Sequence, residues 1–370
     1  MSTGDKRSTI PTPEATSGDY HHRCSRCLLP ETYSDIRFNE DEVCNFCIEY
    51  EQKDTVANSS KRKKRKEWME KFILDAKRRN KSKYDILVSY SGGKDSTYLL
   101  YLLKEQFGLR VLAYSCDTGF MSEEAHRNVN RTIAKLGVDH IWRRPGEEFY
   151  RKLYSYLLTH PGKDGCVATV CPQCFQATGI QATKTALEHK IPLVAYGFSP
   201  AQIGGTRYRI FQSEHMLMLL FSRLLRRSPF QISLSEEERE LFHIRFRDFW
   251  RVPHILYPFN ALDYDIAQVK KTVIEQGLIA SGDEHPLRSN CHVNLLMIDL
   301  DWRRFRYHPY AKEFSQLVRE GQLPRQEWIE QEEERIGAIE QGTFEREKID
   351  AVLERLGLKD YYQACVEKWK

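Results

Sequence analysis

The residue types at positions 89–96 (SYSGGKDS) could bind phosphate groups. Two adjacent glycines allow backbone N–H groups to approach an anion closely, and the start of a following helix adds favourable partial charge. Serine hydroxyls and a lysine ammonium would donate hydrogen bonds to phosphate oxygens, and an aspartate could orient Mg²⁺. The candidate ligands in this loop are Ser89, Ser91, Gly92, Gly93, Lys94, Asp95 and Ser96.

The surrounding sequence supports this interpretation, because an expected strand at 85–90 precedes the loop and a helical pattern at 97–106 follows it. The spacing of a Walker A loop is absent. Residues 91–96 instead resemble the SGGxDS signature of the PP-loop ATP pyrophosphatases. This resemblance implies ATP and Mg²⁺ as ligands. It also implies that ATP adenylates a carbonyl or carboxyl oxygen, pyrophosphate leaves, and a nitrogen or sulfur nucleophile displaces AMP.

Residues at the ends of two other expected strands are further candidates for the ATP site. Asp117 follows the strand expected at 110–116 and could contact ATP or Mg²⁺, although an aspartate here could equally begin a turn. Gly197 closes the strand expected at 192–197 and could form part of the adenine pocket. The glycine-rich segment 204–207 could bind a second anion or be a loop without a ligand.

Four cysteines near the N-terminus have the spacing of a metal site. They form two CxxC pairs, Cys24 with Cys27 and Cys44 with Cys47. Four thiolates at this spacing can surround Zn²⁺ in a closed structural site, and metal binding would supply the folding free energy of so small a unit. An iron–sulfur centre is the alternative. Residues 24–47 also resemble the N-terminal zinc unit of the ExsB-like and N-acetyl sugar amidotransferase branch of the PP-loop family.

A second group of cysteines lies at Cys166, Cys171 and Cys174, just before a helix expected at 173–189. The resemblance to tRNA-thiolating PP-loop enzymes implies that three cysteines could hold a [4Fe–4S] cluster with one iron open for sulfide. Three alternatives stay open: a second zinc with Cys291 or a histidine as fourth ligand, a persulfide-carrying cysteine pair, and buried thiols without a ligand.

Cys116 closes the second expected strand, directly before Asp117. In a parallel sheet this position faces the nucleotide crevice. A nearby helix N-terminus or cation would lower the pKa of its thiol and favour the reactive thiolate, which could carry a persulfide or attack an activated intermediate. A small apolar residue at a strand end is an equally good interpretation.

Strands alternating with helices predict an α/β fold, a doubly wound parallel sheet of the Rossmann-like PP-loop type. Four strands are expected, near 85–90, 110–116, 138–143 and 192–197, and a helix with a good N-cap signal at 122–136. The expected organisation is a disordered tail at 1–20, a four-cysteine zinc unit at 21–52, a basic helical linker at 53–83, a PP-loop ATP-binding domain at 84–204, and a mainly helical substrate or oligomerisation region at 205–370.

The composition of the chain bears on which classes of partner and location to expect. The chain has 370 residues, 41% hydrophobic and 29% charged, with a net charge of +4, which is too mild to require a nucleic-acid partner. We find neither an apolar run long enough to span a membrane nor a secretory signal, and expect a cytoplasmic protein. The basic run 61–66 could contact RNA, but such runs are more often solvated linkers.

The sequence favours sulfur transfer to a nucleobase-type substrate, free or in tRNA, with sulfur from a donor protein. Lysine inside the SGGKDS loop, the second cysteine group and Cys116 support it. The alternative is amide or amidine formation on an N-acetyl sugar with ammonia from a partner glutaminase, which the N-terminal unit supports. A non-catalytic nucleotide-binding scaffold is the minor alternative. A homodimer is compatible with the helical C-terminal pattern.

Overall fold

The computed structural model describes residues 22–53, 56–203, 211–212, 233–244, 248, 251–284 and 291–369. The expected disordered tail at 1–20 and the glycine-rich segment 204–207 lie outside these residues.

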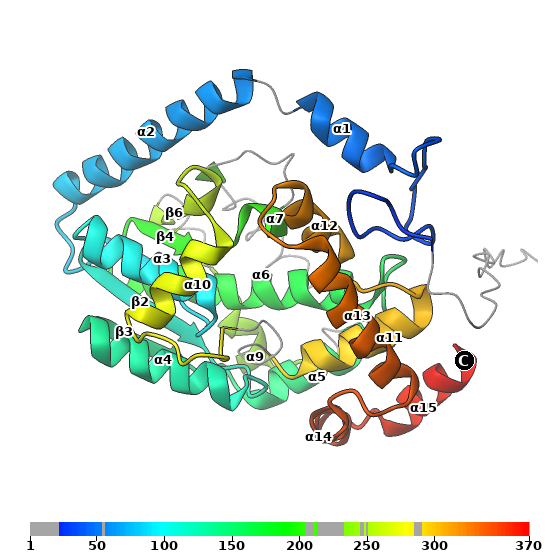
Figure 1. Ribbon diagram of the computed structural model, residues 1–370. Helices are drawn as coiled ribbons and strands as arrows, with labels where there is room; N and C mark the ends of the chain where they lie inside the picture. Colours follow the sequence, from blue (N-terminus) through cyan, green and yellow to red (C-terminus); the bar gives the residue numbers. More distant parts are fainter. Residues whose placement is uncertain are drawn as a thin grey trace, which may run out of the picture.

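The centre of the structure is a sheet with the strand order β3-β2-β1-β4-β6-β5 (Figure 1). All neighbouring strands pair in parallel except β5, which is antiparallel to β6. The strands are β1 (Ile86–Ser89), β2 (Val111–Cys116), β3 (Asp139–Arg143), β4 (Leu193–Tyr196), β5 (Phe211–Gln212) and β6 (His254–Leu256). The predicted α/β fold with a parallel sheet and its four strands is confirmed. The sequence did not predict β5 and β6, which are only two and three residues long.

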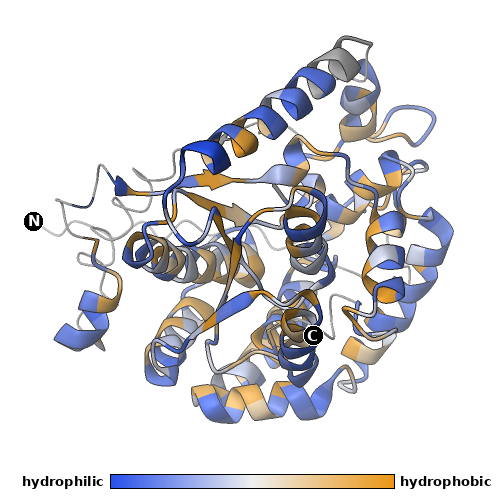
Figure 2. Ribbon diagram, turned by 90° about the vertical axis from the view of Figure 1, so that its left-hand side faces the viewer, coloured by the Kyte–Doolittle hydropathy of each residue, from blue (hydrophilic) through white to orange (hydrophobic). Residues whose placement is uncertain are grey.

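Successive residues of the strands point to opposite faces of the sheet, and both faces are buried. In β1, Leu87 belongs to one apolar core, whereas Ile86 and Val88 belong to the other. Helices α5, α6, α11 and α14 contribute side chains to the first core, and α2, α3, α4 and α10 to the second. In Figure 2 the strands are mainly hydrophobic and the outer faces of the helices mainly hydrophilic. A strand buried on both faces explains the continuous apolar runs in the sequence.

The described helices bracket the sheet and form the C-terminal region. They are α1 (Asn45–Lys53), α2 (Val56–Arg79), α3 (Lys94–Tyr101) continued by the π-helical turn Leu102–Gln106, α4 (Glu123–Leu136), α5 (Glu147–Thr159), α6 (Gly165–Glu188), α7 (Pro200–Ile203), α9 (Glu236–Leu241), α10 (Ile266–Glu275), α11 (Val293–Phe305), α12 (Ala311–Arg319), α13 (Arg325–Glu340), α14 (Arg346–Leu356) and α15 (Lys359–Lys368). None of the helices in the described part of the chain is long and apolar enough to cross a membrane.

Two helix starts show how local and tertiary signals differ. Helix α4 begins as predicted, because the Ser122 hydroxyl accepts a hydrogen bond from the backbone N–H of Ala125 at 3.1 Å. Helix α6 begins at Gly165, eight residues earlier than expected. The reason is tertiary: the carboxylate of Asp301 accepts the backbone N–H groups of Cys166 and Val167 at 2.6 and 2.8 Å.

The N-terminal unit docks against the C-terminal helices rather than against the sheet (Figure 1). The guanidinium of Arg325 donates to the backbone carbonyls of Cys24 and Cys27, each at 2.9 Å. Arg23 pairs with Glu332 at 3.3 Å, and both side chains are buried. Segments from opposite ends of the sequence therefore stabilise one another.

A buried carboxylate connects the first two strands. Asp85 is 1% exposed and accepts hydrogen bonds from the backbone and guanidinium of Arg110 and from the side chain of Asn80. Burial alone would raise the pKa of Asp85, but the hydrogen bonds from Arg110 and Asn80 outweigh it and lower the pKa.

We expect Asp85→Asn to lower the free energy of unfolding at pH 7 by about 2 kcal/mol, because a charged acceptor is lost. A carboxylate with a lowered folded-state pKa stabilises above its unfolded pKa, and this contribution is lost as the pH falls through the folded value. In urea unfolding, the difference from wild type should therefore shrink between pH 7 and pH 3. The control is Asp75→Asn, at a partly exposed carboxylate that pairs with Arg78 on the same helix. It should leave the free energy of unfolding nearly unchanged, because a solvent-screened ion pair contributes little. A difference that does not vary with pH would contradict the assignment.

Candidate functional site

The strand order has a switch point at the carboxyl ends of β1 and β4, the place where doubly wound sheets form a crevice. The chain runs from β1 to β2 and β3 on one side of β1, and then returns to place β4 on the other side. Ligands of doubly wound sheets bind where the strand order reverses in this way. The segment 89–96, which we call the phosphate loop, joins the end of β1 to the start of α3. Gly197 follows β4, so both lie at this crevice.

The loop between β1 and α3 is folded by its own hydroxyl groups. The hydroxyls of Ser91 and Ser96 lie 3.1 Å apart, and Ser96 also donates to the carbonyl of Gly93 at 3.1 Å. Gly92 has a φ of 82°, and a Cβ atom there would lie 2.4 Å from the carbonyl oxygen of Ala125. The loop thus requires glycine, and it leaves the first N–H groups of α3 without partners inside the helix.

Gly197 permits β4 to approach the start of α3. A Cβ atom at Gly197 would lie 2.7 Å from Cα and 2.9 Å from the backbone nitrogen of Ser96. The atoms it would meet are backbone atoms, which cannot move aside as a flexible side chain does. This glycine therefore sets the spacing between the two strand ends that form the crevice.

Lys94 and Asp95 form a charged cluster with two residues that sequence reasoning missed. The Lys94 ammonium donates to Oδ2 of Asp95 at 2.7 Å, and the two side chains are only 10% and 14% exposed. The hydroxyl of Tyr264 donates to Oδ1 of Asp95 at 2.6 Å. Glu313 of α12 faces the same group, and burial raises its pKa to about 7, with Lys94 lowering and Asp95 raising it. No local pattern marks Tyr264 or Glu313, because only the tertiary fold brings them to the loop.

Ser89 and Asp117 are two further candidates for ATP contacts, and both lie at the ends of strands. Ser89 is the last residue of β1, at the mouth of the crevice. Asp117 accepts a hydrogen bond from the backbone N–H of Gly119 at 2.9 Å and one from Arg144 at 3.1 Å. Asp117 therefore begins a turn, and both of its carboxylate oxygens have protein partners.

Cys116 lies at the end of β2 with its sulfur 3.4 Å from the hydroxyl of Tyr150. Burial raises the pKa of Cys116 to about 11, and the hydroxyls of Tyr150 and Tyr114 only partly offset this. The direction is opposite to the lowering expected from the sequence, because desolvation dominates at this position.

The structure brings Cys171 and Cys174 together with Cys291, and we call these three the inner thiol group. Cys171 and Cys174 are three residues apart on α6 and so share one helix face. Burial raises the pKa of each of the three thiols to about 12, with further electrostatic contributions from within the group. All three residues are partly buried and pack against the first apolar core.

Two tyrosine hydroxyls lie beside the inner thiol group. The hydroxyl of Tyr154 lies 3.0 Å from the sulfur of Cys174, and that of Tyr310 lies 4.0 Å from Cys171. A bridge links the backbone of Cys291 to that of Met121, in the loop after β2. The loop that follows Cys116 is thereby held against the inner thiol group, at the same edge of the sheet as the phosphate loop.

Cys166 lies apart from this group. Five residues separate it from Cys171, so it points to another side of α6. Its backbone is bonded to Asp301, and its thiol interacts with Asp301, Arg304 and Cys365, with burial raising its pKa. The grouping of Cys166 with Cys171 and Cys174, expected from spacing, is therefore not the grouping that the fold makes.

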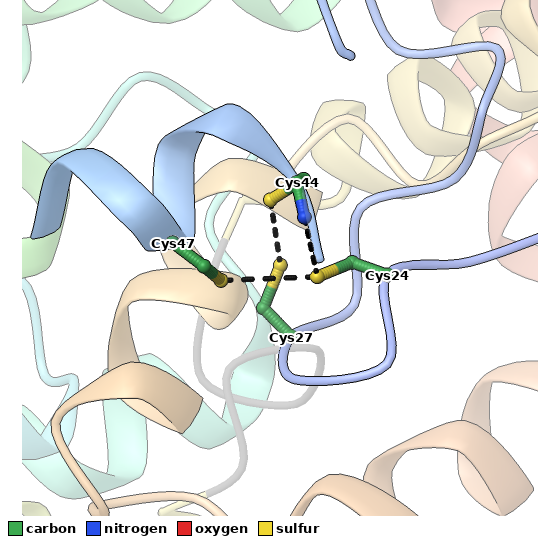
Figure 3. Close-up of side chains that lie close together, drawn as sticks. All are labelled: Cys24, Cys27, Cys44 and Cys47. Atoms are coloured by element: carbon green, nitrogen blue, oxygen red, sulfur yellow. Dashed lines mark hydrogen bonds between the residues drawn. The ribbon is translucent and has the colours of Figure 1, made fainter. Parts of the chain in front are cut away.

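The four N-terminal cysteines converge on one point (Figure 3). The sulfur atoms of Cys24 and Cys47 lie 3.8 Å apart and those of Cys27 and Cys44 3.7 Å apart. All four sulfur atoms lie within 4.8 Å of one another. A zinc ion bonded to four thiolates at about 2.3 Å would separate them by about 3.8 Å, so the donor set fits one tetrahedral ion.

The surroundings of this four-cysteine unit favour anionic sulfur. The backbone N–H groups of Cys44 and Arg26 donate to the sulfur of Cys24 at 3.3 and 3.4 Å. The guanidinium of Arg319 lies 3.8 Å from the sulfur of Cys47. Across the described part of the chain, this is the one group of three or more candidate ligands whose donor atoms all lie so close together.

Basic side chains of the chain have different surroundings. Arg303 is buried and donates to Asp299 and to the carbonyl of Ile339, so it holds helices together. The side chains of Lys63 and Lys64 on α2 are exposed, whereas those of residues 61–62 lie outside the described set.

No protein-family model matches the chain. It is 30% identical over 118 residues to the uncharacterized protein MJ1599 of Methanocaldococcus jannaschii, a match that covers 32% of this chain. The chain spans only 40% of the length of this curated relative.

Three solved structures are similar to this chain at low identity. NMN synthetase from Francisella tularensis matches with a TM-score of 0.34 and 11% identity, covering 60% of this chain and 74% of that one. The U34-tRNA thiolase NcsA from Methanococcus maripaludis, with its [4Fe–4S] cluster, matches with a TM-score of 0.34 and 13% identity over 81% and 86%. The NH3-dependent NAD synthetase from Campylobacter jejuni matches with a TM-score of 0.30 and 12% identity over 55% and 98%.

We predict that the four-cysteine unit binds one zinc ion per chain. Cys44→Ser should abolish this zinc, because a hydroxyl is a far poorer ligand than a thiolate. Elemental analysis of the purified protein measures it, with iron counted separately. Cys365→Ser is the matched control, since Cys365 is buried against other helices and should retain the zinc. Zinc that persists in Cys44→Ser would refute this site.

We predict that Gly197→Ala weakens ATP binding by about tenfold or more, because the new methyl group would push the start of α3 away from β4. Titration calorimetry with ATP and Mg²⁺ measures the affinity. The control is Gly337→Ala in α13, where a Cβ atom would meet nothing within 4 Å. Equal affinities for both variants and wild type would show that ATP does not bind at this crevice.

Proposed function

We propose that this protein is an ATP-dependent sulfurtransferase that adenylates a carbonyl oxygen of a nucleobase-type substrate and replaces that oxygen with sulfur. The observation that carries the proposal is the placement of the phosphate loop and the inner thiol group along one edge of the sheet. The loop follows β1, and the bridge between Met121 and Cys291 brings the thiols to the loop after β2.

The phosphate loop supports the first half of the reaction. The substrate oxygen attacks the α-phosphorus of ATP, a P–O bond forms, and pyrophosphate leaves with the electron pair of the broken bond. Donors from Ser91, Gly93 and Ser96 would hold the phosphates, and the ammonium of Lys94 would offset their charge. Mg²⁺ would bind phosphate oxygens and the Asp95 carboxylate, which offers oxygen ligands of the kind that this ion prefers.

The inner thiol group supports the second half. A sulfur nucleophile attacks the activated carbon, and AMP leaves with the former carbonyl oxygen. Three thiols with neighbouring hydroxyls could hold either a persulfide or a metal cluster. A [4Fe–4S] cluster on Cys171, Cys174 and Cys291 would supply an open iron for sulfide. The sulfur itself would come from a donor protein.

Amide transfer is the competing function, with the same adenylation and ammonia in place of sulfur. The tightly clustered four-cysteine unit is compatible with it, since such a unit resembles that of the sugar amidotransferase branch. Under this alternative the inner thiols have no part in the chemistry. The two functions therefore differ in what they require of Cys171, Cys174 and Cys291.

We expect purified protein, prepared without oxygen, to transfer radiolabelled sulfide to unfractionated tRNA or free nucleosides in the presence of ATP, with release of AMP and pyrophosphate. Cys174→Ser and Cys291→Ser should lose label transfer by about a hundredfold or more, since each removes a sulfur-handling group. Cys166→Ser is the matched control and should retain transfer, because Cys166 faces Asp301 instead.

The opposite result has a clear meaning. Unchanged transfer in Cys174→Ser and Cys291→Ser would rule out sulfur handling by the inner thiol group. AMP formation that depends on ammonia and an N-acetyl sugar, and that survives both substitutions, would establish amide transfer.

A further inference from the structure

Helix α2 and the residues that follow it carry most of the positive charge of the chain. Residues 63–83 contain ten Lys or Arg and three Asp or Glu, a net charge of +7, whereas the whole chain has +4. All other residues together therefore have a net charge of −3. The mild overall charge is the sum of one strongly basic segment and a weakly acidic remainder, and such a segment attracts polyanions.

Basic side chains of α2 form a row on the side of the helix that faces away from the sheet. Met69 and Ile73 are fully buried and hold the helix on the second apolar core. Lys64, Lys71 and Arg78 recur every seven positions, about two helical turns, so they share the opposite side of the helix. All three are exposed, and Arg78 forms an ion pair with an aspartate of the same helix.

The exposed side of α2 also presents an aromatic ring. Among the described residues, the large apolar side chains that are exposed are Trp68 and Leu74, at 44% and 46%, and both belong to α2. Trp68 lies one turn after Lys64, and its indole stacks on Phe72 with ring centroids 5.0 Å apart. We call Lys64, Trp68 and Lys71 the outer face of α2. Cations beside an exposed aromatic ring can bind phosphates and stack on a base at the same time.

Helix α2 begins at the edge of the sheet that carries the phosphate loop (Figure 1). Near its start, Lys66 forms an ion pair with Asp263. The next residue, Tyr264, donates its hydroxyl to Asp95 of the phosphate loop at 2.6 Å. Near its end, Lys77 donates to a carbonyl in the loop before β2, at the opposite edge of the sheet. The outer face of α2, in the first part of the helix, therefore lies on the side of the proposed ATP site.

We propose that the outer face of α2 binds the RNA that carries the base to be modified, with its lysines on phosphates and its indole on an unpaired base. This inference rests on the proposed function and deepens it, because it names RNA rather than a free nucleoside as the substrate. A lipid surface fits less well. A helix that lies in a membrane inserts its apolar side among the lipids, whereas Met69 and Ile73 of α2 are buried in the core.

The first test measures binding of fluorescently labelled, unfractionated tRNA to the full chain by anisotropy over a range of salt concentrations. Lys64→Gln/Lys71→Gln should bind about tenfold or more weakly at low salt. The slope of log affinity against log salt should become shallower by about 1.5, because two phosphate contacts are lost. Lys359→Gln/Lys368→Gln on α15 is the matched control, since it removes two exposed lysines and the same net charge. Equal losses in both double variants would overturn the proposal.

The second test separates stacking from charge. Trp68→Ala should weaken tRNA binding about fivefold or more with an unchanged salt slope, because stacking releases no counterions, and Trp68→Phe should restore most of the affinity. Leu74→Ala, at the other exposed apolar side chain of α2, is the control and should bind as wild type. Wild-type affinity in Trp68→Ala, or the same loss in Leu74→Ala, would contradict base stacking on this face.

The same variants distinguish this inference from the proposed function. Lys64→Gln/Lys71→Gln leaves the phosphate loop and the inner thiol group intact, so it should bind a non-hydrolysable ATP analogue as wild type does while losing sulfur transfer to tRNA. Wild type that binds tRNA through α2 but transfers no sulfur would refute the proposed function and leave the RNA surface standing. Wild type that modifies free nucleosides but binds no tRNA would refute this inference alone. Binding to phosphatidylserine vesicles instead of tRNA, lost in the double variant, would assign the face to a membrane.

Discussion

The rest of the site depends on how closely the ends of β4 and β1 approach each other. Beyond the sheet, Gly197 comes so near the backbone of Ser96 that no side chain fits between them. This contact fixes where α3 begins, and α3 in turn directs Lys94 and Asp95 towards Tyr264 and the helix that carries Glu313. A backbone contact is therefore what gives the charged groups their geometry, because rigid elements position side chains better than loops do.

Local signals were enough to predict four strands of the sheet, the glycine turn between β1 and α3, and the closeness of the four N-terminal cysteines. Continuous apolar runs marked four strands, and glycines and CxxC pairs mark backbone and metal requirements directly in the sequence. The residues that only the tertiary fold brings together were not predictable in this way. Hydrogen bonds to Asp301 make α6 begin before Cys166. Cys166 and Cys171 therefore lie on the same helix and point to different sides of it. Likewise, nothing near Glu313 in the sequence points to the loop.

The two cysteine groups have opposite environments, and this suits different chemistry. The four-cysteine unit is buried, and its sulfur atoms lie close enough to enclose one ion completely. The inner thiol group has three members with hydroxyl neighbours, and its sulfur atoms are not gathered as closely as those of the four-cysteine unit. Closed sites stabilise a fold, whereas sites with an open position can take part in reactions. The raised pKa of each inner thiol means that it needs a bound partner to become anionic at neutral pH.

The docking of the N-terminal unit on α12 and α13 has a consequence for synthesis on the ribosome. Cys24 and Cys47 leave the ribosome well before Ser315 and Arg325, which hold the unit in place, are made. At about 5–20 residues per second, the intervening chain takes on the order of 15–60 seconds to appear. During that interval the nascent unit has its metal ligands without its docking surface. Metal capture would thus come first, and docking would follow once α12 and α13 have been made.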